Sequence, residues 1–92
     1  MSDLIIDITE ENEGTYQAQL MGHYGVAKPI LDLNGAEDVT EGILSEDQES
    51  AYILAEFLLE HQEAGLLPPI VEIADVVAAY DFAIERFEEL KK

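Results

Sequence analysis

The stretch PIVEIADVVAAYDFAIERFEEL, residues 69–90, decides how this chain folds, because its apolar side chains recur every three or four residues. This spacing is typical of an amphipathic α-helix. The side chains on the predicted apolar stripe are Ile73, Val76, Val77, Tyr80, Ala83, Ile84 and Phe87. Those on the opposite side are Asp75, Asp81, Glu85, Glu88 and Glu89. The pattern predicts a core-facing helix with an acidic back and specifies no chemistry.

A second helix is predicted upstream, over residues 45–64. Ser45 and Gln48 have the spacing of a capping box, with Ser45 as the N-cap, and the Pro68-Pro69 pair ends the segment. The core stripe of this helix comprises Ala51, Leu54, Ala55 and Leu58. Its acidic row comprises Glu49, Glu56, Glu60 and Glu63.

The first part of the chain alternates between apolar and polar residues, which indicates strands. Residues 3–9 and 15–21 predict a β-hairpin with a turn at Gly14, and residues 26–33 predict a third strand. Pro29 cannot donate to a ladder, so we expect this strand at an edge. Residues 36–44 form an acidic connection with one helical turn.

The predicted architecture is therefore α+β: a small three-stranded antiparallel sheet followed by two amphipathic helices, in the order β-β-β-α-α. We expect residues 1–92 to form a single domain, with the sheet in residues 1–34 and the helices in residues 45–91.

The net charge is the unusual property of the chain. Twenty-one acidic residues against four basic ones give a formal charge of −17, whereas a small domain ordinarily carries about 2–8. The last eight residues hold as many bases as acids, so the whole excess lies in residues 1–84, where Lys28 is the sole cation. This charge disfavours nucleic acid, anionic membranes and phosphate substrates, and favours a basic protein as the partner.

The acidic helix faces are the candidate partner-binding site. Glu49, Glu56, Glu60 and Glu63 on one helix, with Asp81, Glu85 and Glu88 on the other, form rows of carboxylates in a repeat that resembles backbone phosphates. Lysines four residues from these glutamates would relieve the repulsion, but they are nearly absent. Phe82 is a candidate apolar anchor within this surface. The alternatives are an ordinary solvated helix face and adaptation to high salt.

Catalytic and metal-binding motifs are absent from the sequence. There is no cysteine, the two histidines lack partners at ligand spacing, and the serines have no histidine nearby in sequence. The acidic loops lack the spacing of a calcium-binding loop. We therefore expect a non-enzymatic protein without metal or cofactor. With no secretory signal or long apolar run, it is expected in the cytoplasm as a monomer or dimer.

In size, charge and lack of catalytic motifs, the chain resembles the small acidic proteins of phages and mobile elements that block restriction or CRISPR systems. The resemblance implies a DNA or RNA mimic that binds a CRISPR effector or a restriction enzyme. The hairpin IIDITEENEGTYQAQL, followed by a helix that ends before Pro68-Pro69, also resembles HicB-type antitoxins, which implies neutralisation of a basic toxin. The predicted final helix departs from the last strand of those antitoxins. A structural subunit of an oligomer is the other alternative.

Overall fold

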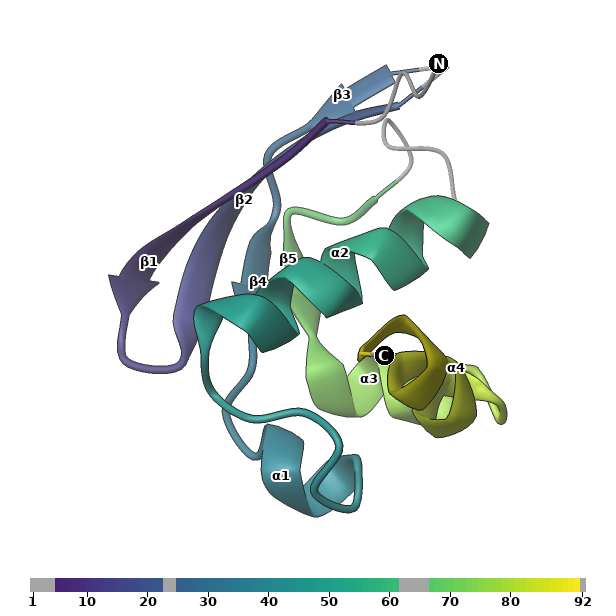
Figure 1. The fold of residues 1–92 in the computed structure, drawn as a ribbon. Coiled ribbons are helices and arrows are strands. Elements are labelled where there is room, and N and C mark those ends of the chain that lie inside the picture. Colours follow the sequence, from purple (N-terminus) through teal and green to yellow (C-terminus); the bar gives the residue numbers. More distant parts are fainter. Residues whose placement is uncertain (1–4, 23–24, 62–66, 92) are drawn as a thin grey trace.

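The computed structural model describes residues 5–22, 25–61 and 67–91 and has an α+β architecture, as predicted, with five strands and four helices in these residues (Figure 1). The strands are β1 (Ile5–Asn12), β2 (Thr15–Gly22), β3 (Gly25–Ala27), β4 (Ile30–Asp32) and β5 (Ile70–Glu72). The helices are α1 (Ala36–Val39), α2 (Gln48–His61), α3 (Ile73–Ala79) and α4 (Ala83–Lys91). The sheet order is β1-β2-β4-β5, and β3 also pairs with β2.

The predicted hairpin is confirmed. β1 and β2 pair antiparallel, and Gly14 in the turn has a φ of 81°, which L side chains rarely adopt. A Cβ atom at this position would also lie 2.3 Å from Oδ1 of Asn34, so the turn requires glycine for two reasons. Tyr16, Ala18 and Leu20 point into the core, as their alternation predicted.

The prediction of a single third strand at an edge is wrong. Residues 26–33 are divided at Lys28 and Pro29 into β3 and β4, which pair with different parts of β2. Pro29 interrupts the strand because it has no N–H, but its carbonyl oxygen still accepts a hydrogen bond from Ala18 N at 3.0 Å. β4 is an interior strand, because β5 pairs with its other side.

The predictions of an all-antiparallel sheet and of a purely helical second half are also wrong, because β5 is a strand and pairs parallel to β4. Ile30 N donates to Pro69 O at 2.8 Å, and Val71 is buried beside Leu31. The β-branched pair Ile70 and Val71 fits a strand, and Pro69 keeps the preceding backbone extended. The chain therefore completes a parallel crossover from β4 through α1 and α2 to β5.

The long helix predicted over residues 69–90 is instead β5, α3, a turn and α4. Tyr80 ends α3 in an extended conformation (φ −123°, ψ 108°), and α4 restarts at Ala83. The apolar stripe nevertheless predicted the buried side correctly for Ile73, Val76, Ala83 and Phe87. Packing explains the break, because the turn allows Phe87 to approach Phe57 to 5.0 Å between ring centroids.

The N-cap of α2 is Asp47 rather than the predicted Ser45. Oδ1 of Asp47 accepts a hydrogen bond from Ser50 N at 2.7 Å, and its carbonyl oxygen accepts the first helical bond, from Ala51 N. The hydroxyl of Ser50 accepts from Ser45 N at 2.9 Å, so it satisfies a backbone donor outside the helix. α2 thus begins two residues later than a cap at Ser45 would place it.

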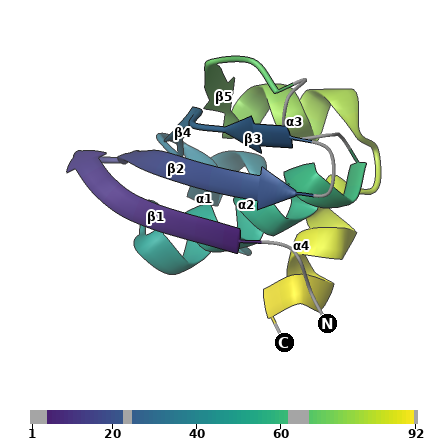
Figure 2. The ribbon, with the colours of Figure 1, turned by 90° about the horizontal axis from the view of Figure 1, so that it is seen from above.

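All four helices lie on one face of the sheet, and α2 lies between the sheet and α4 (Figures 1 and 2). Because two sides of α2 are covered, its buried face is wider than the predicted stripe. The buried residues of α2 are Ser50, Ala51, Ile53, Leu54, Ala55, Phe57 and Leu58. Within residues 5–22, 25–61 and 67–91, no helix combines the length and apolar character needed to cross a membrane.

Candidate functional site

The packing of α2 leaves a narrow strip of this helix open to solvent. Glu49, Tyr52, Glu56 and Glu60 are spaced by three, four and four residues, which places them on one side of the helix. Tyr52 is 44% exposed, and Glu56 is partly covered. The strip contains three of the four predicted carboxylates of this row. The fourth, Glu63, lies outside the described residues.

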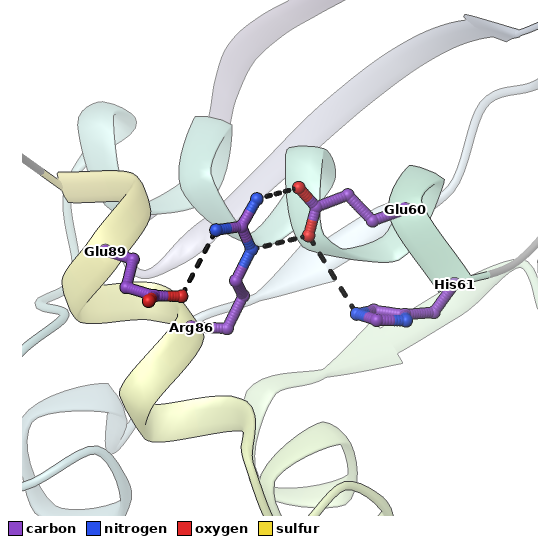
Figure 3. A network of polar contacts seen from close by, with 4 residues as sticks. All are labelled: Glu60, His61, Arg86 and Glu89. Carbon is purple, nitrogen blue, oxygen red and sulfur yellow. Dashed lines mark hydrogen bonds and ion pairs between the residues drawn. The ribbon is translucent and has the colours of Figure 1, made fainter.

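Glu60 is not a free carboxylate, because Arg86 of α4 binds it through two nitrogens (Figure 3). Nε of Arg86 donates to Oε1 of Glu60 at 2.9 Å, and a terminal guanidinium nitrogen donates to Oε2. The other terminal nitrogen donates to Oε1 of Glu89 at 3.2 Å. Arg86 thus joins α2 to α4 and neutralises part of the predicted surface. The sequence showed that the charges of the last eight residues cancel, but it did not show that Arg86 binds Glu60 of α2.

This bridge changes the acidity of its members. The hydrogen bonds from Arg86 hold the pKa of Glu60 below its ordinary value, against a smaller opposing effect of burial. The same hydrogen bonds, from Glu60 first and Glu89 second, raise the pKa of Arg86. His61 lies 3.9 Å from Glu60 and is a weaker member of the network. The bridge stays ionised across the physiological range, so it is a fixed positioning contact.

Five predicted carboxylates remain without a cation in the part of the chain that the structure describes: Glu49, Glu56, Asp81, Glu85 and Glu88. The two on α4 are exposed and lie one helical turn apart. Asp81 is exposed too, but it lies in the turn before α4 rather than on a helix. The structure therefore brings the two predicted rows onto neighbouring helices and removes Asp81 from its row.

A hollow of about 350 Å³ lies between the first half of α2 and the end of α4. Its lining residues are Gln48, Glu49, Tyr52, Ile53, Glu56, Leu90 and Lys91. Lys91 donates from Nζ to the carbonyl oxygen of Ile43 at 2.9 Å, which anchors the end of α4 to the loop before α2. An exposed tyrosine ring and two carboxylates therefore border one concave surface.

Phe82, the predicted anchor, belongs to an aromatic cluster that joins α2 to the turn before α4. Its ring centroid lies 5.1 Å from His61, 5.8 Å from Tyr80 and 5.9 Å from Phe57. Phe57 is fully buried, whereas Phe82 is 46% exposed. Phe82 thus has a structural role through its inner side and presents the rest of its ring to solvent.

One cluster of carboxylates, at the ends of β4 and β5, was not predicted from the sequence. Asp32 and Glu72 are paired in the parallel register, and Asp75 follows in the first turn of α3. The pKa of Glu72 is raised, chiefly by repulsion from Asp75 and by a hydrogen bond with it. Slight desolvation and repulsion from Asp32 add to this effect. A helix pattern extended back to residue 70 concealed this group, because it placed Glu72 on a helix instead of beside Asp32.

No cluster of three or more His, Cys, Asp or Glu residues suited to a metal ion occurs in residues 5–22, 25–61 and 67–91. Comparisons with protein-family models, with curated proteins and with solved structures found no match to this chain. Any functional conclusion therefore depends on the surface itself.

Proposed function

We propose that the protein is a non-enzymatic inhibitor that binds a basic nucleic-acid-binding surface of another protein, in the manner of a DNA or RNA mimic. Anti-CRISPR and anti-restriction proteins are the functional class. The proposed partner is a CRISPR effector or a restriction enzyme in the cytoplasm of the host cell, and the protein acts there.

The observation that carries this proposal is the incomplete neutralisation of α2 and α4 by cations of the described residues. Of the three cations that the structure describes, Arg86 is bound between Glu60 and Glu89, and Lys91 donates to a backbone carbonyl. Lys28 lies between β3 and β4, away from these helices. The remaining carboxylates, Glu49, Glu56, Glu85 and Glu88, are thus available to cations of a partner, and their repulsion would be relieved by binding.

The spacing of the carboxylates is compatible with mimicry of phosphates. Glu49 and Glu56 are two helical turns apart, about 10 Å along the axis. Phosphates of one DNA strand follow one another at about 3.4 Å along its axis, so three steps cover the same length. Arg86 supports this arrangement by fixing α4 beside α2, which holds Glu85 and Glu88 on a rigid neighbouring helix.

The test is reversal of charge on the exposed strip. Glu49→Lys combined with Glu56→Lys is expected to weaken binding to the partner by about tenfold or more, because two attractions become repulsions. Affinity capture from host lysate at low and high salt, with mass spectrometry, identifies the partner. Competition with labelled DNA for the purified partner then gives the dissociation constants.

A matched control is available in Glu13→Lys combined with Glu37→Lys. Both residues are exposed, lie on the hairpin turn and α1, and change the net charge by the same amount. This variant should compete with DNA almost as well as the unmodified protein. Equal losses in the two variants would show that total charge matters and the α2 strip does not.

β5 supports a second candidate, a HicB-like antitoxin that neutralises a basic toxin. A strand follows Pro68-Pro69 directly, in the place where the resemblance to those antitoxins implies their last strand. Both candidates describe neutralisation of a basic protein. Co-expression with a small basic protein encoded beside this gene separates them: rescue of growth supports the antitoxin, and protection of phage DNA from restriction or CRISPR interference supports the inhibitor.

A further inference from the structure

Within the described residues, one face of the sheet carries no helix, because α1 to α4 all lie on the other side (Figure 2). Alternation along the strands identifies the side chains on this open face. Tyr16, Ala18 and Leu20 of β2 are buried against the helices, so Gln17, Gln19 and Met21 point the opposite way. The strand register then extends this assignment to the residues paired with them.

Large apolar side chains are concentrated on this open face. Among the described residues, six large hydrophobic side chains are exposed: Ile5, Met21, Val26, Tyr52, Ile70 and Phe82. Four of the six lie on the open face. Their exposed fractions are 48% for Ile5, 39% for Met21, 52% for Val26 and 58% for Ile70.

The four residues form two rows across the strands. Ile5 pairs with Met21 and Met21 pairs with Val26, so the first row crosses β1, β2 and β3 without interruption. Ile70 pairs with the partly exposed Ile30, which gives a second row across β5 and β4. The rows are about 13 Å apart along β2, four strand residues. Val26 also borders a hollow of about 280 Å³ whose other walls include Pro68 and Pro69.

Carboxylates flank both apolar rows on the same face. Asp7 lies two residues from Ile5 on β1, and Asp32 and Glu72 lie two residues from Ile30 and Ile70. Asp75 and Asp32 both repel the carboxylate of Glu72 and raise its pKa. A cation supplied from outside would therefore be favoured beside each row.

We propose that the open face of the sheet is a second protein-binding surface, which takes a partner surface with apolar side chains in its centre and Lys or Arg at its rim. Apolar centres with polar rims are the usual anatomy of protein interfaces. A second copy of this chain fits poorly, because it would bring −17 against −17. The proposal uses the proposed function for one point, the basic character of the partner, and does not require the α2 strip to bind it.

Two synthetic peptides of equal charge serve as probes: one of fourteen residues that alternates Lys with Leu, and one that alternates Lys with Ser. Each is titrated into the ¹⁵N-labelled protein at about 0.15 M salt. The Lys-Leu peptide is expected to shift the amide resonances of Ile5, Met21, Val26 and Ile70. The Lys-Ser peptide should shift mainly the amide resonances of Glu49 and Glu56 on α2 and of Glu85 and Glu88 on α4.

Met21→Ser combined with Val26→Ser should raise the dissociation constant of the Lys-Leu peptide by about tenfold and change that of the Lys-Ser peptide by no more than about twofold. Tyr52→Ser, which removes an exposed ring on the helical side, is the matched control and should leave the dissociation constant of the Lys-Leu peptide within about twofold. Identical shift maps for the two peptides in the unmodified protein would overturn the proposal, even if the double variant fails to fold.

Sedimentation equilibrium tests the other occupant of this face. A monomer at about 0.15 M salt agrees with the proposal. A dimer that the Met21→Ser, Val26→Ser double variant dissociates would overturn it, because the face would then belong to a second copy. Failure of the charge-reversal variant on α2 to affect partner binding would refute the mimicry alone, since that variant leaves the open face unchanged.

Discussion

At the scale of the residue, Glu72 shows how one carboxylate can oppose folding although it lies at the surface. It stands between β5 and α3, where Asp75 acts on it by repulsion and through a hydrogen bond, and Asp32 is its neighbour across the strands. Its pKa is raised above the ordinary value, so the folded protein binds this proton more tightly than the unfolded chain. The resulting cost to stability exists above the raised pKa and disappears as the pH falls below the ordinary pKa.

Replacing Glu72 by Gln should therefore raise the melting temperature at pH 7 by a few degrees at most, because the amide carries no charge and still has a donor for Asp75. The difference from the unmodified protein should shrink as the pH falls and vanish near the ordinary glutamate pKa of about 4.3. Thermal melts followed by circular dichroism at low salt, from pH 7 to pH 4, measure this. Glu37→Gln on α1 is the control, and a pH-independent difference would contradict the explanation.

At the scale of the element, two interruptions of regular secondary structure determine the fold. Pro29 divides one apolar run into β3 and β4, and the extended Tyr80 divides another into α3 and α4. The sequence pointed to Pro29 as a residue without a donor for the ladder, but this favoured a continuous edge strand over residues 26–33 and not a break. The second break could not be predicted either, because residues 70–90 keep a helical period throughout, and only contacts with Leu31 and Phe57 decide where the chain is strand, helix or turn.

The start of α2 gives a test at this scale. Asp47→Ala should lower the free energy of unfolding by about 1 kcal/mol, because Ser50 N loses its cap. Ser45→Ala, at the position that the sequence indicated, should cost less than about 0.5 kcal/mol, since its side chain caps no helical N–H. Urea denaturation followed by circular dichroism measures both. A larger loss of unfolding free energy for Ser45→Ala than for Asp47→Ala would show that Ser45 is the N-cap.

At the scale of the whole molecule, self-repulsion opposes a compact structure. The charge of −17 is spread over a body whose longest dimension is 32 Å. The Debye length falls from about 30 Å at 0.01 M salt to about 8 Å at physiological ionic strength, so most of these charges interact across the molecule at low salt and few do at high salt. The bridge from Arg86 to Glu60 and Glu89 is a small attraction within this repulsive total.

The melting temperature should accordingly rise by several degrees when NaCl is increased from 10 to 500 mM at pH 7, because screening relieves more repulsion than attraction. Differential scanning calorimetry measures the rise. Choline chloride should produce the same increase, since the effect requires no particular cation. A flat or falling melting temperature would show that the exposed carboxylates do not repel one another strongly.

The sequence alone determined the α+β class, the hairpin with Gly14 in its turn, the α2 segment, the buried stripe of the last segment and the charge of the surface. These are local properties: alternation, helical period and composition act within a few residues. The tertiary structure alone decided that β5 pairs parallel with β4, that Arg86 forms an ion pair with Glu60, and that the described helices leave one face of the sheet open. The strand pairing joins residues 40 positions apart and the ion pair joins residues 26 positions apart, and no local pattern encodes contacts of this range.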